Sequence, residues 1–282
     1  MITCNLMGGL GNQIFQIFAT ISYAIKSKNR FKFMNVEKLG SGSTTVRNTF
    51  WNSFFSRLKP FLIDNITQPI HVIREKDFTY NELPLYEMIG HDALIYGYFQ
   101  SYKYFQENFE TICKIINVKN MKDKLIGKIE ELYTNLNLSE CVSIHFRIGD
   151  YKKIQDFHPI MTKEYYFKSL NLIKSKCNNN FTVIYFCEDN DLDDVMININ
   201  YLKNHFKEYT FIRGDNSLED WEQMLFMSCC HHNIIANSSF SWWAAYFNDW
   251  TDKIVCYPYI WFGPACNNNT KDLCPNEWNK IY

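Results

Sequence analysis

The most chemically informative segment of this 282-residue chain is His145-x-Arg147-x-Gly149-Asp150-Tyr151. An arginine guanidinium can bind two phosphate oxygens at once, and a fixed cation can stabilise a departing nucleoside diphosphate. Because alternate residues of a strand share a face, His145 and Arg147 are expected on the same side of a strand end. Asp150 would either hold Arg147 in place or accept a proton from an attacking hydroxyl. A structural Arg–Asp pair at a turn is the alternative.

A glycine-rich turn near the N-terminus is the second candidate, where the apolar run 2–7 leads into Gly8-Gly9-Leu10-Gly11-Asn12-Gln13. An amphipathic helix is predicted to follow over about 12–26. Strand, turn and helix in this order present backbone N–H groups and a positive helix end to an anion. A purely structural turn and a dinucleotide fingerprint are the alternatives, but Ile14 replaces the third glycine of that fingerprint.

Two polar segments follow predicted strands further along the chain. Helix-capping residues precede a predicted helix at Asn237-Ser238-Ser239-Phe240-Ser241, and hydroxyls there suit either a diphosphate or ordinary capping. The acidic run Glu188-Asp189-Asn190-Asp191 contains an Asp-x-Asp triplet of the kind that holds Mg²⁺ or Mn²⁺ on a sugar nucleotide. The same run would also serve to bind a ribose or base hydroxyl, or form a solvated turn.

Alternating strands and helices position these segments. Strands are predicted over 142–146, 181–187, 209–212, 233–236 and 253–257, with helices between them over 162–176, 217–229 and 242–247. Ser217 and Asp220 resemble a capping box for the second of these helices. This alternation predicts an α/β fold with a parallel sheet covered on both faces, and ligands then bind beyond the carboxyl ends of the strands. A helix over 122–136 is predicted to close the first half, with domains over 1–138 and 139–282.

Composition limits the partners and the compartment. The formal net charge is −1 and no basic stripe stands out, which argues against a nucleic-acid partner. The N-terminus lacks the features of a signal peptide, and no apolar stretch there is long enough to span a bilayer. Several of the ten cysteines lie in apolar runs, so a soluble cytoplasmic protein with reduced thiols is expected. Cys229-Cys230-His231-His232 is interpreted as a helix end with buried cysteines rather than a metal site.

Together these segments resemble the α-1,2-fucosyltransferase family, which is glycosyltransferase family 11. The likeness also includes Gly97-Tyr98-Phe99-Gln100-Ser101, Glu219-Asp220, the run 232–244 and Cys274-Pro275, in the family's order. It implies a GT-B architecture, in which two Rossmann-like halves face a cleft. Residues 1–138 would then form the acceptor-side domain, and residues 139–282 the domain that binds the GDP-sugar.

The resemblance further implies a GDP-fucose donor, a galactose-type acceptor hydroxyl, inversion at the anomeric carbon, and no metal or other cofactor. Arg147 would stabilise the leaving diphosphate with support from His145. The remaining donor-binding residues would be Gly11, Asn12, Gln13, Glu188, Asp189, Asn237, Ser238, Ser239 and Ser241. The alternatives are a transferase of the same build that uses another deoxyhexose nucleotide, and a catalytically silent glycan-binding protein.

Overall fold

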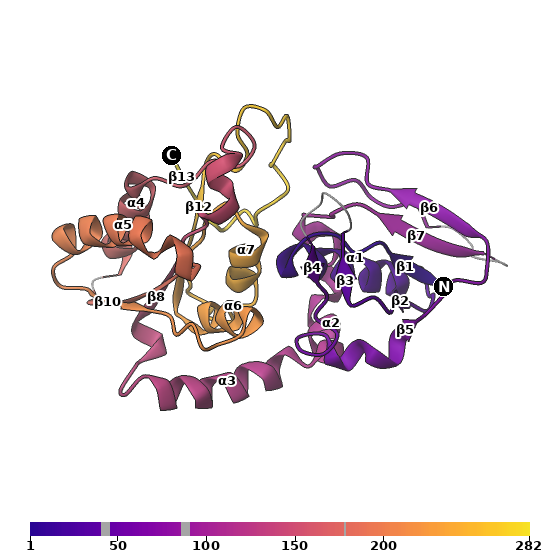
Figure 1. Ribbon diagram of the computed structural model, residues 1–282, viewed down its shortest axis with the longest axis horizontal. Helices are drawn as coiled ribbons and strands as arrows, with labels where there is room; N and C mark the ends of the chain where they lie inside the picture. Colours follow the sequence, from indigo (N-terminus) through magenta and orange to yellow (C-terminus); the bar gives the residue numbers. More distant parts are fainter. Residues whose placement is uncertain (41–45, 86–90, 178) are drawn as a thin grey trace. The chain divides into compact units, whose positions relative to one another are not determined.

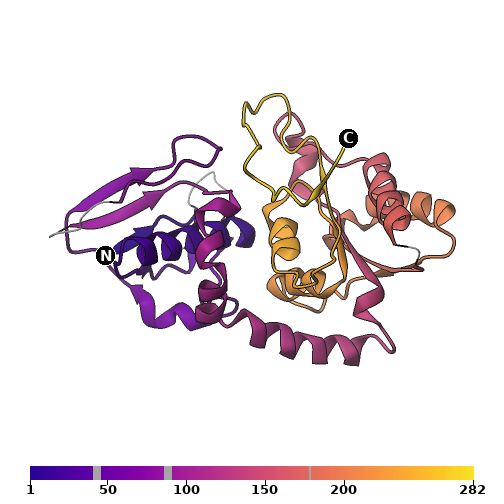
Figure 2. The ribbon, with the colours of Figure 1, turned by 180° about the vertical axis from the view of Figure 1, so that it is seen from behind.

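The computed structural model describes residues 1–40, 46–85, 91–177 and 179–282, which fold into two units (Figures 1 and 2). The first unit consists of Met1–Met121 and Asn268–Pro275, and the second of Lys122–Asn267 and Asn276–Tyr282. The sequence pattern predicts a boundary after residue 138, whereas the units divide inside helix α3 (Val118–Leu132).

The C-terminal segment 268–275 belongs to the first unit because Asp272 anchors it there. Its carboxylate pairs with Lys103 Nζ at 2.6 Å and accepts a hydrogen bond from the backbone N–H of Tyr80 at 3.1 Å. The carbonyl of Asp272 accepts a third bond from Ser101 Oγ at 2.6 Å. These contacts join residues far apart in the sequence, so no local pattern predicts them.

The first unit is built from short, mostly parallel strands around helix α1 (Leu10–Lys26). Its strands are β1 (Ile2–Cys4), β2 (Phe33–Met34), β3 (Lys38–Leu39), β4 (Arg47–Asn48), β5 (Leu62–Ile63), β6 (Ile70–Arg74) and β7 (Asp92–Tyr96), and its second helix is α2 (Phe109–Ile116). A parallel sheet has the order β1-β7-β6, and β2 pairs with β5 in parallel. A bridge between Ile2 and Phe31 continues the parallel arrangement on the other side of β1. Only β3 and β4 pair antiparallel among the described strands.

Helix α1 is buried nearly all round, not on one face as its amphipathic pattern predicts. Even the polar Gln13, Gln16 and Thr20 are fully buried. The Gln16 side-chain amide pairs with both backbone groups of Met7, at 2.9 and 3.3 Å, much as a neighbouring strand would. Polar residues in this helix therefore satisfy the backbone of the β1–α1 connection, not solvent.

The second unit contains one parallel sheet with the strand order β10-β9-β8-β11-β12-β13. The strands are β8 (Cys141–His145), β9 (Thr182–Phe186), β10 (Thr210–Arg213), β11 (His232–Ile234), β12 (Val255–Pro258) and β13 (Asn279–Ile281). The helices are α4 (Lys163–Lys176), α5 (Leu192–His205), α6 (Asp220–Cys229) and α7 (Ser239–Tyr246). The chain begins at β8 in the centre, runs outward to β10 and returns to β11 on the other side of β8. Ligands of such doubly wound sheets bind where the strand order reverses, which here is between the carboxyl ends of β8 and β11.

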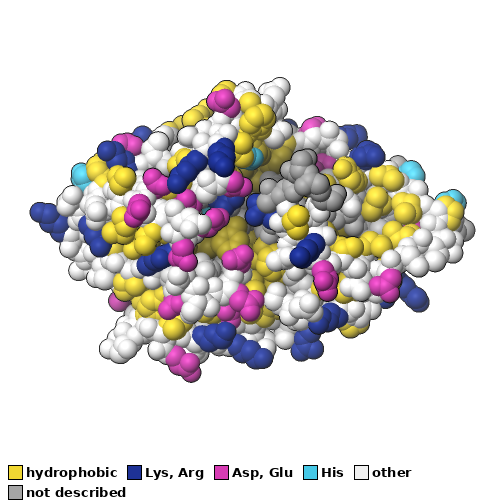
Figure 3. Space-filling view, viewed as in Figure 1, with side chains coloured by type: hydrophobic (Ala, Val, Ile, Leu, Met, Phe, Trp, Pro, Cys, Tyr) yellow, Lys and Arg dark blue, Asp and Glu magenta, His cyan; other side chains and the backbone are white. Residues whose placement is uncertain are grey.

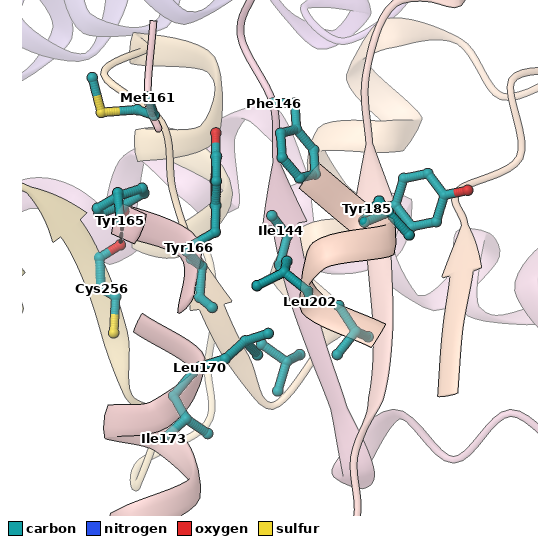
Figure 4. Packing of buried hydrophobic residues seen from close by; sticks show 14 of the residues in the cluster. Ile144, Phe146, Met161, Tyr165, Tyr166, Leu170, Ile173, Tyr185, Leu202 and Cys256 are labelled. Atoms are coloured by element: carbon teal, nitrogen blue, oxygen red, sulfur yellow. Dashed lines mark hydrogen bonds between the residues drawn. The ribbon is translucent and has the colours of Figure 1, made fainter. Parts of the chain in front are cut away.

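Helices α4 and α5 cover one face of this sheet, and α6 and α7 the other (Figures 1 and 2). Ile144 of β8 packs with Leu170 of α4 and Leu202 of α5 in the hydrophobic cluster of the second unit (Figure 4). The hydroxyl of Tyr165 in α4 donates to the carbonyl of Cys256 at 3.1 Å, which ties the helix to β12. The predicted α/β class with a parallel sheet covered on both faces is confirmed.

Two local predictions have different outcomes. Helix α6 forms where predicted, but its capping box is made by Glu219 and Glu222, not by Ser217 and Asp220. Cys229 and Cys230 at its end are buried, which confirms the interpretation of this segment as a helix end.

The surface carries mixed charge and the thiols are free. On the face that Figure 3 shows, acidic and basic side chains are interspersed over the described surface. No disulfide joins the ten cysteines, all of which lie in the described part of the chain. No helix within the described ranges has the length and apolar character needed to cross a membrane.

Candidate active site at the carboxyl ends of β8 and β11

Strand β8 delivers the candidate catalytic residues to the point where the strand order reverses. All five of its residues are buried, and their alternation sends Val142 and Ile144 toward α4 and α5. Ser143 lies on the opposite side, where its Oγ accepts a hydrogen bond from Asn233 Nδ2 at 2.7 Å. His145 ends the strand with its ring 5.5 Å from that of Phe240 in α7.

Arg147 is held by two carboxylates. Its Nη1 donates to Glu188 Oε1 and its Nη2 to Asp150 Oδ1, both at 2.5 Å. The guanidinium also lies over the Tyr151 ring, 4.9 Å from its centroid. Burial opposes the charged form, but Asp150, Tyr151 and Glu188 outweigh it and raise the pKa of Arg147. Arg147 is therefore a permanently charged group with a fixed orientation.

His145 is a buried, neutral imidazole. Burial, and secondarily the charge of Arg147, lower its pKa to about 3. Its Nδ1 is buried and has no hydrogen-bonding partner among the described residues. His145 therefore adds no positive charge near neutral pH, but it offers a ring nitrogen for a hydrogen bond.

The turn after Arg147 depends on Gly149 and on a buried aspartate that the sequence did not single out for this role. Gly149 has φ +28°, and a Cβ there would lie 3.3 Å from Glu188 Oε2 and 3.6 Å from Arg147 Nη1. The Gly149 N–H donates to Asp191 Oδ2 at 2.6 Å. Asp191 is 3% exposed, and its other oxygen lies 3.3 Å from Lys152 Nζ. Asp191 thus fixes the turn that carries Asp150.

We expect the Asp191→Ala substitution to destabilise the protein by about 1–3 kcal/mol, because it leaves a partly buried N–H group without an acceptor. Asp191→Asn keeps an acceptor oxygen and should lose less. Urea unfolding at pH 7 measures both. Asp194→Ala is the matched control, since it removes the other carboxylate on Lys152, at 2.6 Å, but leaves the Gly149 hydrogen bond intact. Equal losses in the Asp191→Ala and Asp194→Ala variants would contradict this role.

The Asp-x-Asp triplet does not converge on one point. Asp189 accepts hydrogen bonds from Arg213 Nη2 at 2.5 Å and from Asn216 Nδ2 at 2.9 Å. Those contacts, Arg213 first, lower the pKa of Asp189. Asp191 instead faces the Gly149 turn. Within the described residues no group of three or more His, Cys, Asp and Glu side chains is arranged to hold a metal ion.

The segment after β11 supplies a helix N-terminus beside β8. Ser238 caps α7, with its Oγ accepting from the Phe240 N–H at 3.3 Å, while Ser239 is half-buried. Ser241 is fully buried and points to the carbonyls of Ala236 and Ser238. Of the predicted hydroxyls, Ser238 and Ser239 are therefore better placed for a ligand than Ser241.

Asn237 joins this segment to the loops around it. Its Nδ2 donates to the carbonyls of Pro159 and Trp261, each at 3.0 Å, and its own carbonyl accepts from the Tyr151 hydroxyl at 3.2 Å. His158 stacks on Tyr151 with a ring distance of 4.8 Å. Tyr151 therefore lies between the guanidinium of Arg147 and the α7 segment.

Three residues of the segments described above carry a buried polar atom without a partner among the described residues. The described residues contain seven such side-chain atoms, and three of them are His145 Nδ1, His158 Nδ1 and Asn237 Oδ1. Buried polar groups are normally hydrogen-bonded, so these three atoms are candidates for hydrogen bonds to a ligand. His158 had no motif that would have identified it in the sequence.

The glycine-rich turn of the first unit has a clear structural role. Gly8 has φ +76°, and a Cβ there would lie 2.4 Å from Asn12 Nδ2. Gln13 is fully buried and donates to the carbonyls of Gly8 at 3.0 Å and Asn48 at 2.9 Å. Asn12 Oδ1 accepts a bond from Gln100 at 2.8 Å, and Gly11 is buried in the first turn of α1. The structure thus shows these residues stabilising the turn, and their contact with a donor stays a prediction.

The carboxylate of Glu75 in the first unit was not identified as a structural residue from the sequence. Glu75 accepts the N–H groups of Tyr98 at 2.7 Å and Phe99 at 2.9 Å, where Phe99 has φ +52°. Burial raises the pKa of Glu75 despite these two bonds. Glu75 therefore stabilises the connection after β7 that carries Gln100.

Comparison with known proteins gives a match along nearly the whole chain. A family model described as "Glycosyl transferase family 11" matches residues 1–281. An α-1,2-colitosyltransferase from Escherichia coli is 27% identical over 301 residues, covering 100% of this chain and 99% of that protein. The O-antigen biosynthesis glycosyltransferase WbnK, also from E. coli, is 26% identical over 316 residues, covering 99% of each protein.

Similarity to solved structures is weaker. The E. coli ADP-heptose lipopolysaccharide heptosyltransferase II has a TM-score of 0.38 at 10% identity, over 57% of this chain and 43% of that one. A glycosyl transferase of family 9 from Veillonella parvula has a TM-score of 0.37 at 11% identity, over 57% and 39% of the two chains.

Proposed function

The chain belongs to glycosyl transferase family 11, and on this premise we propose that it transfers L-fucose from GDP-fucose to a hydroxyl of a glycan acceptor. The expected acceptor position is O2 of a galactose-type residue, with inversion at the anomeric carbon. The second unit would bind the GDP-sugar and the first would face the acceptor, as in a GT-B enzyme. The observation that carries the proposal is the position of Arg147, a fixed cation that follows the carboxyl end of β8, while the neighbouring strand β11 leads to the α7 N-terminus.

Arg147 would act on the leaving group. As the acceptor hydroxyl attacks the anomeric carbon, the bond between that carbon and the diphosphate oxygen breaks, and negative charge develops on the GDP. A preorganised guanidinium and the N-terminal N–H groups of α7 stabilise that charge without reorganising. Because these groups supply the electrostatic stabilisation that a metal would otherwise give, we expect no metal requirement.

Asp150 has two candidate roles, which are to orient Arg147 and to act as the base, and its contact with Arg147 favours the first. Its carboxylate bonds Arg147 Nη2 at 2.5 Å, which supports a role in orienting the guanidinium. To act as the base, it would have to accept the proton of the acceptor hydroxyl while still close to Arg147. We therefore propose Asp150 first as a positioning residue. His145, neutral and with an unpartnered Nδ1, would contribute a hydrogen bond, not charge.

A second donor is favoured by a specific observation. The full-length relative from E. coli is named an α-1,2-colitosyltransferase, and colitose is the 3-deoxy analogue of fucose. A site that hydrogen-bonds the 3-hydroxyl would reject the deoxy sugar by several orders of magnitude, whereas an apolar site discriminates only weakly. The kcat/KM ratio for the two GDP-sugars therefore decides between the two donors.

We expect a donor screen that detects released GDP to give turnover with GDP-fucose, lactose or N-acetyllactosamine serving as acceptor. Rates should be unchanged in excess EDTA, because the charge on the leaving group is met by Arg147. Turnover with GDP-colitose alone would replace the donor in the proposal. Glycan binding without GDP release from any donor would instead indicate a silent binding protein.

A further inference from the structure

Two carboxylates already bind the guanidinium of Arg147 at the place where the proposed function requires it to meet a diphosphate. Nη1 is taken by Glu188 and Nη2 by Asp150, both at 2.5 Å. Asp191 lies at the same turn, and Lys152 is its nearest cation. The immediate surroundings of Arg147 thus hold more acidic than basic groups. A guanidinium has five N–H donors, so hydrogen-bonding capacity remains, but the two carboxylates already offset its single positive charge. A diphosphate therefore binds Arg147 most tightly when one of the two carboxylates leaves.

Glu188 is the carboxylate that can leave. Its side chain is 60% exposed, and Arg147 is the single hydrogen-bonding partner of its carboxylate within the described residues. It follows the end of β9, so rotation about its own side-chain bonds would carry it into solvent without moving the turn after β8. Asp150 is tied to Arg147 through the short turn that Asp191 anchors. Exchange at Nη1 therefore requires less reorganisation than exchange at Nη2.

We propose that Glu188 is a displaceable counter-charge on Arg147: it occupies Nη1 until an oxygen of the nucleoside diphosphate takes its place. This inference rests on the proposed function and replaces the expected role of Glu188 as a direct donor ligand. Glu188 orients the guanidinium before the donor arrives. It also competes with the bound diphosphate, so it weakens the affinity for the GDP product and favours its release.

The test compares Glu188→Gln with wild type in the full-length protein. The substituted amide keeps the size and an acceptor oxygen but loses the charge, so GDP should bind about threefold to tenfold tighter by calorimetry. Guanosine, which carries no phosphate, should bind equally to both proteins when titrated by NMR. Asp193→Asn is the matched control, because it removes an equal charge from an exposed residue five positions away that does not bond Arg147. It should change the affinity for GDP by less than about twofold.

Each outcome has one meaning. Tighter GDP binding with unchanged guanosine binding supports the counter-charge. Unchanged or weaker GDP binding by Glu188→Gln overturns it, and weakening of GDP and guanosine together would make Glu188 a ligand of the nucleoside. Wild-type protein that binds no GDP would overturn the proposed function and this inference together, whereas a normal wild-type affinity with no effect of Glu188→Gln overturns the inference alone.

Discussion

Replacing Arg147 by alanine should lower kcat by about a hundredfold to a thousandfold while leaving the protein folded. The loss follows from removing the one guanidinium that is preorganised to take up the charge of the departing diphosphate, for which a single donor is typically worth about 10²–10³ in rate. Asp150 and Glu188 are each about half-exposed, at 50% and 60%, so water can solvate them once Arg147 is gone. GDP release from GDP-fucose at saturating acceptor measures the effect, and circular dichroism checks the fold.

Two further substitutions sharpen this prediction. Arg147→Lys keeps a positive charge but loses the bidentate fork, so it should recover only a part of the lost rate. Arg74→Ala is the matched control, since Arg74 lies over the Tyr96 ring at 4.8 Å much as Arg147 lies over Tyr151. Its rate should stay close to that of wild type. An Arg147→Ala enzyme with near-normal turnover would remove the central residue of the proposed mechanism.

The second large effect is expected on stability in acid. An unfolded chain protonates a histidine near pH 6.5, whereas His145 in the folded protein does so only near pH 3. Because the folded-state pKa is lowered, stability that is present above pH 6.5 is lost as the pH falls toward 3. The loss from this one residue is about 1.4 kcal/mol per pH unit, or roughly 4–5 kcal/mol across the window.

His145→Phe should remove this contribution, since it keeps a ring beside Phe240 but cannot be protonated. Urea unfolding at several values between pH 7.5 and 4.5 should give a shallower acid slope for the variant, by about one proton, and parallel curves above pH 7. His232, whose pKa is lowered to about 4 by burial and then by His231, keeps part of the acid sensitivity in both proteins. Identical slopes for the two proteins would show that His145 titrates normally in the fold.

Local patterns in the sequence predicted most of the second unit's elements, but not helix α5 or strand β13. The run 142–146 predicted β8 because four of its five residues are apolar or small, which suits a strand that is covered on both faces. The helix predicted over 162–176 forms as α4, and the side chain of Thr162 caps it by accepting the N–H of Tyr165. The position of Arg147 at the carboxyl end of a strand was also predictable, because the strand that precedes it has a clear apolar pattern.

Other features depend on contacts that no local pattern encodes. The capping box of α6 formed at Glu219 and Glu222, two residues beyond the predicted Ser217, whose own N–H donates to Asp215 Oδ1 in the preceding turn. Helix α1 was predicted to be amphipathic, yet its polar residues are buried, and Gln13 reaches the carbonyl of Asn48, 35 residues away. The anchoring of segment 268–275 to the first unit likewise joins residues some 170 positions apart.

The sequence by itself determined the α/β class, the identity of Arg147 as the candidate cation and the family to which the chain is similar, because these follow from residue types at short spacing. Only the tertiary structure decided that β8 and β11 are neighbours and that Arg147 is shared between Asp150 and Glu188. It also decided that Asp189 and Asp191 face different partners. Strand order and side-chain pairing arise from packing between segments distant in the chain. The spacing of residues along the sequence does not determine which of these segments come into contact.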